Sequence, residues 1–184
     1  RALPAETFYK LDVRFDPVGP SAKDFLAGEY QPVGETGGVV ELTAEQRQGL
    51  RLLQDDIALT ECPLSPDLLK IARELSDVAV IRRIAAVLDH CKLGYTVNVM
   101  LAAVVEKGRM DAAGKAMASR AAVSHCYQRK TFAGWPYNLF AMIHAGRMED
   151  VQRFIDELAV EYRICDYALL PTVREFKKKP VFYS

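Results

Sequence analysis

One short segment of the chain, Val123–Arg129, carries side chains suited to proton transfer and anion binding. If the segment is a strand, alternation places Val123 on one face with three polar side chains: His125, Tyr127 and Arg129. A histidine titrates near neutral pH, a tyrosine supplies a phenol, and an arginine keeps its positive charge. The other face then holds Ser124, Cys126 and Gln128. The alternative interpretation is an ordinary half-exposed sheet face, where polar alternation is common.

The two remaining histidines also lie where they could take part in chemistry. His144 ends a predicted strand, and a strand-end histidine satisfied by its neighbours is the alternative interpretation. His90 lies in a loop between the two halves of the chain, where sites often form, and could supply an iron ligand or contact a carboxylate. An ordinary loop fits that spacing equally well. Three cationic side chains flank the loop: Arg82, Arg83 and Lys92.

Charge is balanced over the whole chain but uneven along it. The 184 residues hold 24 Lys and Arg against 24 Asp and Glu, which argues against a uniformly basic nucleic-acid-binding protein. Residues 43–90 hold 6 basic and 8 acidic residues, a net charge of −2. Residues 91–184 hold 14 and 9, a net charge of +5. The second region is therefore the one expected to attract an anion.

Several classes of protein are disfavoured by what the sequence lacks. Phosphate-binding glycine loops and the HExxH and GxSxG patterns are absent, which argues against nucleotide hydrolysis and standard hydrolase chemistry. The 4 cysteines form no CxxC pair, so free thiols in a reducing cytoplasm are favoured over a zinc or iron–sulfur site. No apolar run reaches the ~18 residues of a membrane span, and no secretory signal is visible. We expect a cytoplasmic protein.

The elements that must position the candidate residues form a recognisable order in residues 91–184. Four segments have strand patterns and two carry helical stripes, in the order βαββαβ. This is the split βαβ, or ferredoxin-like, arrangement, in which helices cover one face of an antiparallel sheet. The predicted strands are Tyr95–Val105, Ala122–Lys130, Tyr137–Ala145 and Ile164–Leu170, and the predicted helices are Asp111–Ser119 and Glu149–Tyr162.

Residues 43–90 have the pattern of a helix-turn-helix. Thr43 and Gln46 match a capping box at the start of one helix, and Ser65 with Pro66 begins a second helix.

A β-branched stretch, Val80–Leu88, then indicates a strand, so that the region resembles a winged helix-turn-helix. That motif needs a third helix, and the four residues between Leu75 and Val80 are too few for a recognition helix of ~10 residues. Either the chain has lost this helix, or a stretch is missing from the sequence at this abrupt junction. We favour the second explanation.

Residues 1–42 are rich in glycine and proline, and only Phe8–Phe15 has a strand pattern. We interpret this region as an arm that could pair with a sheet edge, followed by a long linker. The sequence thus predicts an α+β protein of three regions: an arm and linker (1–42), a helix-turn-helix-like domain (43–90) and a ferredoxin-like ligand or catalytic domain (91–184).

Several strings of this sequence together resemble one family. They are VIRRIAAVLDH (80–90), KLGY (92–95), VSHCYQR (123–129), WPYNLFAMIH (135–144) and REFKK (174–178). They resemble the sirohaem (siroheme) decarboxylases of the alternative haem and haem d1 pathways, which are built on the Lrp/AsnC scaffold of transcription regulators. The resemblance covers about residues 43–179, and the VSHCYxR and WPYNLF strings are its specific part. The chain departs from the family in the missing third helix and in its 42-residue arm.

The resemblance implies non-oxidative decarboxylation of two acetate side chains of siroheme to methyl groups, giving 12,18-didecarboxysirohaem. It implies no cofactor beyond the iron of the substrate itself, and no metal site in the protein. The implied catalytic residues are His125, Tyr127 and Arg129. The implied substrate-binding residues are His90, Lys92, Arg82, Arg83, Trp135, Tyr137 and His144.

The expected partners are siroheme and a paralogous subunit in a heterodimer, or a second copy in a homodimer, with no nucleic acid and no membrane. Two other functions stay open. A ligand-responsive Lrp/AsnC-type regulator is disfavoured by the net charge of −2 in residues 43–90 and by the missing recognition helix. A non-catalytic haem-binding module is poorly separated from the enzyme by the sequence alone.

Overall fold

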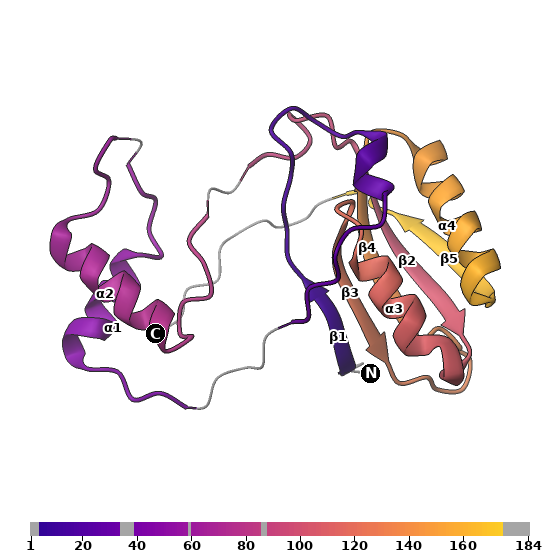
Figure 1. The fold of residues 1–184 in the computed structure, drawn as a ribbon, viewed down its shortest axis with the longest axis horizontal. Coiled ribbons are helices and arrows are strands. Elements are labelled where there is room, and N and C mark those ends of the chain that lie inside the picture. Colours follow the sequence, from indigo (N-terminus) through magenta and orange to yellow (C-terminus); the bar gives the residue numbers. More distant parts are fainter. Residues whose placement is uncertain (1–3, 34–38, 59, 86–87, 175–184) are drawn as a thin grey trace. The chain divides into compact units, whose positions relative to one another are not determined.

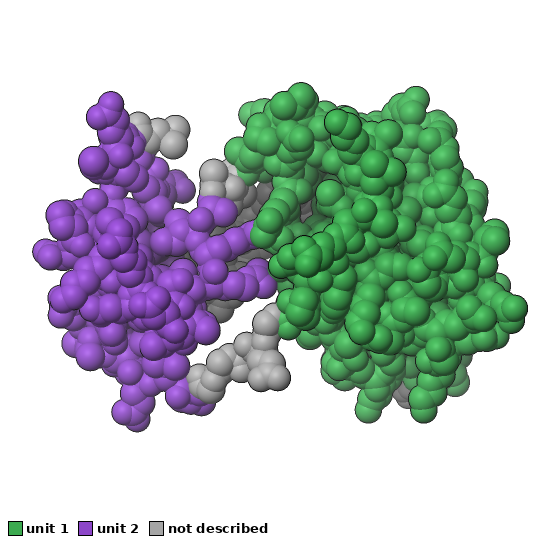
Figure 2. All heavy atoms as spheres, in the orientation of Figure 1, with its two compact units in different colours: residues 1–33, 88–175 green, residues 34–87, 176–184 purple. Residues whose placement is uncertain are grey.

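The computed structural model describes residues 4–33, 39–58, 60–85 and 88–174. The chain divides into two compact units (Figure 2). The described part of the first, residues 4–33 and 88–174, is called the sheet unit here. The described part of the second, residues 39–58 and 60–85, is called the two-helix unit. Within the described residues, no helix combines the length and apolarity needed to cross a bilayer.

The sheet unit is built on five antiparallel strands in the spatial order β1-β3-β4-β2-β5 (Figure 1). The chain order β2-α3-β3-β4-α4-β5 confirms the predicted βαββαβ arrangement. The strands are β1 (Ala5–Leu11), β2 (Val97–Val105), β3 (Val123–Arg129), β4 (Leu139–Ala145) and β5 (Ile164–Pro171). The helices are α3 (Met110–Ala118) and α4 (Met148–Tyr162), with 3-10 turns at Ala22–Phe25 and Lys107–Arg109.

The core of the sheet unit lies between the sheet and its two helices. Leu101 of β2 and Ala141 of β4 are register partners, and both are fully buried. They belong to one apolar cluster with Met117 of α3 and Ile155 of α4. Because side chains alternate along a strand, the residues next to Leu101 in β2 and next to Ala141 in β4 point to the opposite face of the sheet. We call that opposite face the histidine face; it carries Asn98, Met100, His125, Tyr127, Phe140, Met142 and His144.

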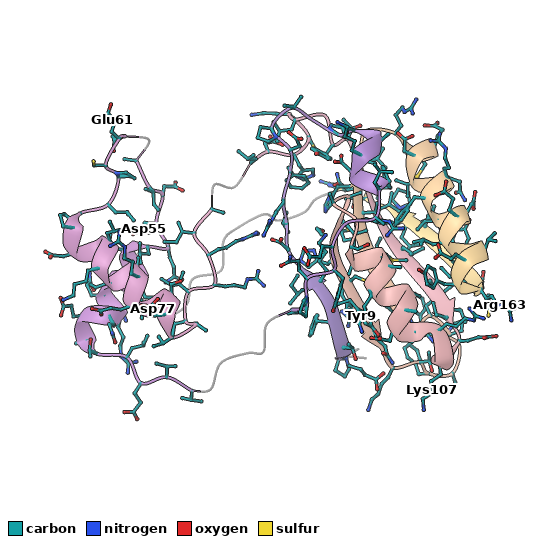
Figure 3. The ribbon with its side chains drawn as sticks, viewed as in Figure 1. Tyr9, Asp55, Glu61, Asp77, Lys107 and Arg163 are labelled. Atoms are coloured by element: carbon teal, nitrogen blue, oxygen red, sulfur yellow. The ribbon has the colours of Figure 1, made fainter. Side chains whose placement is uncertain are left out.

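The N-terminal arm contributes an edge strand to this sheet. β1 pairs antiparallel with β3, which confirms the predicted pairing of the arm with a sheet edge. Tyr9, labelled in Figure 3, is only 3% exposed and lies against α3 at Gly114, where a side chain would collide with its ring. Mainly because of burial, the pKa of Tyr9 is raised to about 12. The arm is thus part of the core.

The two-helix unit consists of α1 (Ala44–Leu52) and α2 (Pro66–Asp77). Both predicted helix starts are confirmed: Thr43 and Gln46 form a capping box, and the Ser65 hydroxyl accepts a hydrogen bond from the Leu68 amide. The helices approach closely, since a Cβ on Gly49 would lie 2.7 Å from a methyl group of Ile71.

The predicted strand Val80–Leu88 is wrong. Residues 80–85 and Leu88 form no regular structure, and residues 86–87 lie outside the described residues. The chain leaves α2 through Ala79 in a left-handed conformation, φ 57°, and the amides of Val80 and Ile81 both donate to the Leu75 carbonyl. β-Branched residues favour a strand only where a neighbouring strand pairs with them. The helix-turn-helix assignment and the domain boundaries stay predictions.

Candidate functional site

All three histidines of the chain come together at one end of the sheet unit. His144 lies near the end of β4, His125 lies in the neighbouring strand β3, and His90 lies in the loop before β2. The ring centres of His90 and His144 are 5.9 Å apart. A serine hydroxyl joins the rings of His125 and His144 by hydrogen bonds. The fold therefore gathers three candidates that are far apart in the sequence.

A β-bulge in β3 sets the direction of the side chains around His125. Val123 pairs with Ile143, but His125 pairs with Met142, so β3 holds one residue more than β4 at this point. Val123 and Cys126 consequently both face the helices, within the apolar cluster. The predicted strict alternation, with Val123 beside His125 and Cys126 beside Ser124, is therefore wrong at the start of the strand. His125 and Tyr127 do share the histidine face.

Ser124, the residue at the bulge, is a site residue that the sequence reasoning missed. It is 3% exposed, and its Oγ lies 2.9 Å from Nδ1 of His125 and 2.8 Å from Nε2 of His144. On its other side, Nδ1 of His144 lies 2.5 Å from Oδ1 of Asn98, its register partner in β2. A continuous hydrogen-bonded chain thus runs across three strands. The three-residue spacing of the apolar Val123 and Cys126 was a signal of the bulge.

Phe15, from the segment after β1, packs against the histidines. Its ring is stacked on His90 at 5.3 Å between centres, meets His144 edge-on at 5.0 Å, and contacts Tyr95 at 4.9 Å. The Tyr95 hydroxyl accepts a hydrogen bond from the Asp16 amide at 3.1 Å, which fixes the segment that carries Phe15. The N-terminal arm therefore shields the histidines from water, a role that its composition did not predict.

His144 is held in its neutral form. Burial, followed by the nearby imidazoles of His90 and His125, lowers the pKa of His144 to about 4. A neutral imidazole donates through one ring nitrogen and accepts through the other, as the contacts with Asn98 and Ser124 require. His144 is therefore suited to hydrogen bonding and poorly suited to donating a proton at neutral pH.

A row of aromatic rings holds Arg129 farther along the histidine face. The guanidinium carbon of Arg129 lies 4.7 Å from the ring centre of Tyr127 and 5.9 Å from that of Phe140. The two rings are stacked, with centres 5.8 Å apart, and the Tyr127 hydroxyl lies 3.9 Å from the sulfur of Met100. Cation–π contact orients the guanidinium, and a planar guanidinium is chemically suited to binding a carboxylate.

The other predicted substrate-binding residues lie elsewhere. Trp135 and Tyr137 contact each other in the turn before β4, at the opposite end of that strand from His144. Lys92 lies in the same loop as His90 and forms an exposed ion pair with Asp89 at 3.7 Å. Arg82 and Arg83 are exposed residues of the two-helix unit. The fold thus brings His90, His125 and His144 together, with Tyr127 and Arg129 along the same sheet.

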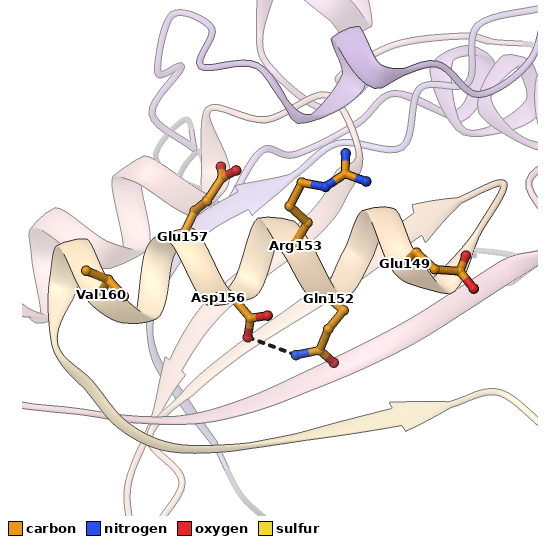
Figure 4. Close-up of a pocket in the computed structure, with 6 residues that line it drawn as sticks. All are labelled: Glu149, Gln152, Arg153, Asp156, Glu157 and Val160. Carbon is orange, nitrogen blue, oxygen red and sulfur yellow. Dashed lines mark hydrogen bonds between the residues drawn. The ribbon is translucent and has the colours of Figure 1, made fainter.

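Two further features bear on metal and pocket chemistry. Among the described residues, no group of three or more His, Cys, Asp or Glu side chains is arranged to hold a metal ion. The 4 cysteines are free thiols, as predicted. A shallow hollow on the outer side of α4 is lined by none of the predicted site residues (Figure 4); its lining residues are Glu149, Gln152, Arg153, Asp156, Glu157 and Val160.

Comparison with known protein families supports the fold and extends to function. Residues 92–177 match the model of the AsnC-like ligand binding domain. The structure resembles that of an AsnC family transcriptional regulator from Agrobacterium tumefaciens, with a TM-score of 0.61, 15% identity, and coverage of 77% of this chain and 97% of the other. The protein thus has an α+β, Lrp/AsnC-like fold.

Proteins with a higher sequence identity to this chain than that regulator are named siroheme decarboxylases. The siroheme decarboxylase of Hydrogenobacter thermophilus is 31% identical over 95% of this chain and 54% of its own length. The crystal structure of the siroheme decarboxylase NirDL in complex with an iron-uroporphyrin III analogue matches 83% of this chain and 48% of that chain, with 31% identity and a TM-score of 0.52. The chain thus spans about half the length of these two proteins.

A shorter relative matches over almost its whole length. The siroheme decarboxylase beta subunit of Methanosarcina barkeri is 33% identical over 72% of this chain and 93% of the relative. Because the shared part includes nearly all of that subunit, the chain belongs to the siroheme decarboxylase family.

Proposed function

We propose that this chain is a subunit of a siroheme decarboxylase and binds siroheme at the histidine face of the sheet unit. One observation carries the proposal: three histidines and Arg129 lie on or beside one sheet face in a member of this family. The iron-uroporphyrin III analogue bound to the related NirDL supports a tetrapyrrole ligand. The proposed reaction removes the carboxyl groups of two acetate side chains, giving 12,18-didecarboxysirohaem.

The proposed decarboxylation requires only that the protein orients the carboxylate, excludes water and supplies a proton. Heterolysis of the bond between the carboxylate and its methylene releases CO2 and leaves the electron pair on a carbon next to the conjugated macrocycle, which delocalises it. Addition of one proton then completes the methyl group. The protein must fix the carboxylate, exclude water and deliver that proton. No cofactor beyond the iron of the substrate is part of the proposal.

The residue roles follow from the local chemistry. His125 donates the proton, because His144 is kept neutral and cannot. Arg129, oriented by the rings of Tyr127 and Phe140, holds a carboxylate. His90 and Phe15 border the site and limit the entry of water. His144 lies in the same histidine cluster, and Lys92 follows His90 in its loop. The predicted siroheme contacts of Arg82, Arg83, Trp135 and Tyr137 stay predictions.

The proposed assembly is a heterodimer with a paralogous subunit, or a homodimer. The relatives named as beta, NirH and NirL subunits support a multi-subunit complex. The half-length match to the siroheme decarboxylase of Hydrogenobacter thermophilus is compatible with two such regions joined in one longer chain.

The test is anaerobic incubation of the protein with siroheme, alone and with its paralogous subunit, followed by mass analysis of the tetrapyrrole. A protein-free incubation is the control for spontaneous loss. We expect loss of two CO2 per siroheme in the complete assembly. Tight binding of siroheme that is recovered unchanged from every assembly would contradict the proposal and favour the non-catalytic haem-binding module.

A further inference from the structure

We infer that Ser124 and Asn98 are positioning residues, which fix the tautomers of His144 and His125 so that His125 exchanges its proton through Nε2. The inference rests on the proposed function only where it assigns the proton of His125 to the substrate. Its basis is the hydrogen-bonded chain Asn98–His144–Ser124–His125. A chain of this kind has a direction, because each hydroxyl or imidazole in it donates on one side and accepts on the other.

Asn98 sets that direction. Its amide nitrogen lies on the side of the Tyr95 carbonyl, at 3.5 Å, and its Oδ1 faces Nδ1 of His144 at 2.5 Å. Turning the amide over would place two oxygens, from Asn98 and Tyr95, against each other without a proton between them. The orientation given therefore makes Oδ1 the acceptor, and Nδ1 of His144 must carry the hydrogen.

The tautomer of His144 determines which way the hydrogen bond with Ser124 points. With its hydrogen on Nδ1, a neutral His144 has its lone pair on Nε2, 2.8 Å from the Ser124 hydroxyl. The low pKa of His144 keeps the ring neutral above about pH 4. The serine hydroxyl therefore donates to His144. Its other potential acceptor, the Met142 carbonyl, is farther away at 3.5 Å, so it competes weakly for the single hydroxyl hydrogen.

Ser124 in turn fixes His125. Because its hydrogen is directed to His144, its oxygen is an acceptor toward Nδ1 of His125 at 2.9 Å, and Nδ1 must carry a hydrogen. Neutral His125 then has its lone pair on Nε2, and cationic His125 carries its second proton there. When the Nε2–H bond breaks and a C–H bond forms on the substrate, His125 becomes the neutral Nδ1–H form. No other hydrogen bond in the chain has to change.

The bulge explains why a serine stands at this position. It turns Ser124 away from regular alternation and toward the two rings, while Val123 and Cys126 stay in the apolar cluster. The backbone is held from the arm, where the Asp12 amide donates to the Ser124 carbonyl at 2.9 Å. A buried hydroxyl held between two imidazoles gives the fixed geometry that a positioning role needs.

The tautomers can be measured without siroheme. The chain holds only 3 histidines, so long-range ¹H–¹⁵N spectra of the imidazoles contain six nitrogen signals. We expect His144 and neutral His125 both in the Nδ1–H form. In Ser124→Ala, Nδ1 of His125 loses its hydrogen bond to Ser124 and we expect a shift toward the Nε2–H form, which Ser124→Thr reverses. Asn98→Asp keeps an acceptor oxygen and leaves the tautomer of His144 unchanged.

Wild-type His125 in the Nε2–H form, or an unchanged His125 tautomer in Ser124→Ala, would overturn the inference. The wild-type spectrum alone decides the first point, whatever the fate of the variants. In the assembled enzyme we expect Ser124→Ala to lower the single-turnover rate roughly tenfold, the effect of one lost hydrogen bond, with siroheme affinity unchanged. If the tautomers are as expected but no assembly decarboxylates siroheme, the proposed function fails and the positioning roles stand.

Discussion

The sheet unit and the two-helix unit differ in how firmly they hold their side chains. Both helices and four strands of the sheet unit contribute to one buried apolar cluster. The buried residues of α1 and α2 are only Gly49, Ala72 and Leu75. A site that depends on imidazoles held at hydrogen-bonding distance needs a rigid frame, and only the sheet unit has the core to supply one. The difference favours the sheet unit as the location of the proposed chemistry.

The largest expected effect concerns the arm that completes this core. Tyr9→Ala should lower the free energy of unfolding of the sheet unit by about 3–5 kcal/mol, because it removes a buried ring that fills the space beside Gly114. Phe8→Ala is the matched control on the same strand, since Phe8 is 46% exposed. Urea unfolding followed by circular dichroism measures both. Equal, small losses in the two variants would show that the arm is not part of the core.

The next effect is a pH dependence that His144 confers on the sheet unit. Its folded-state pKa of about 4 lies below the usual 6.5, so between these values the unfolded chain binds a proton that the folded chain excludes. The stabilisation is complete above pH 6.5 and is lost as the pH falls to 4, by about 3 kcal/mol at most. His144→Gln should flatten the curve in that window. Parallel pH profiles of unfolding for the two proteins would refute the assignment.

A somewhat smaller effect is expected for siroheme binding. Arg129→Ala removes a charge-assisted hydrogen bond to a substrate carboxylate and should weaken binding by ~1.5–3 kcal/mol. Arg153→Ala, which removes an exposed arginine from the outer side of α4, is the matched control and should leave the affinity unchanged. Anaerobic absorbance titrations with siroheme compare the two. An equal loss of affinity in both variants would indicate a general charge effect.

The smallest effect should be confined to the two-helix unit. Leu75→Ala removes its largest fully buried side chain, and we expect a loss of about 2 kcal/mol, the lower end of the cost of such truncations. Hydrogen exchange should speed up in α1 and α2, while the β2 and β4 amides and the imidazole signals stay as they are. Leu69→Ala, at a 39% exposed position of the same helix, is the control. Faster exchange in β4 would remove the distinction between the units.

Periodicity was enough to predict the framework of the sheet unit. The stripe of α4 (Val151, Phe154, Ile155, Leu158) is buried as its helical spacing indicates, and alternate residues of β2 and β4 (Leu101, Ala103, Leu139, Ala141, Ile143) lie in the apolar cluster. Local patterns succeed in these elements because one face of each packs on a single core. The same rule of strict alternation failed at Ser124, since a bulge depends on the pairing of two strands rather than on the residues of one.

Contacts between distant segments account for the other misses. Residues 80–85 have strand propensity, but they pair with no strand in the part of the chain that the structure describes, so their β-branched side chains do not produce a strand. Phe15 lies in a glycine- and proline-rich region that gave no sign of its contacts with His90 and His144. The sequence named all three histidines as candidates. Their meeting, and the serine that joins two of them, depend on the strand order and could not be read from spacing.

We propose that siroheme loses two acetate carboxyl groups at the histidine face, with His125 as the proton donor. Single-turnover decarboxylation by the assembled complex tests it most directly, comparing His125→Ala with Gln128→Ala, a neighbouring residue of β3 whose side chain contacts Glu6 instead. Since general acid catalysis contributes ~10²–10⁴-fold, we predict a rate loss of that size for His125→Ala and a near-normal rate for Gln128→Ala. A folded His125→Ala complex that decarboxylates siroheme at the wild-type rate would show that His125 is not the proton donor.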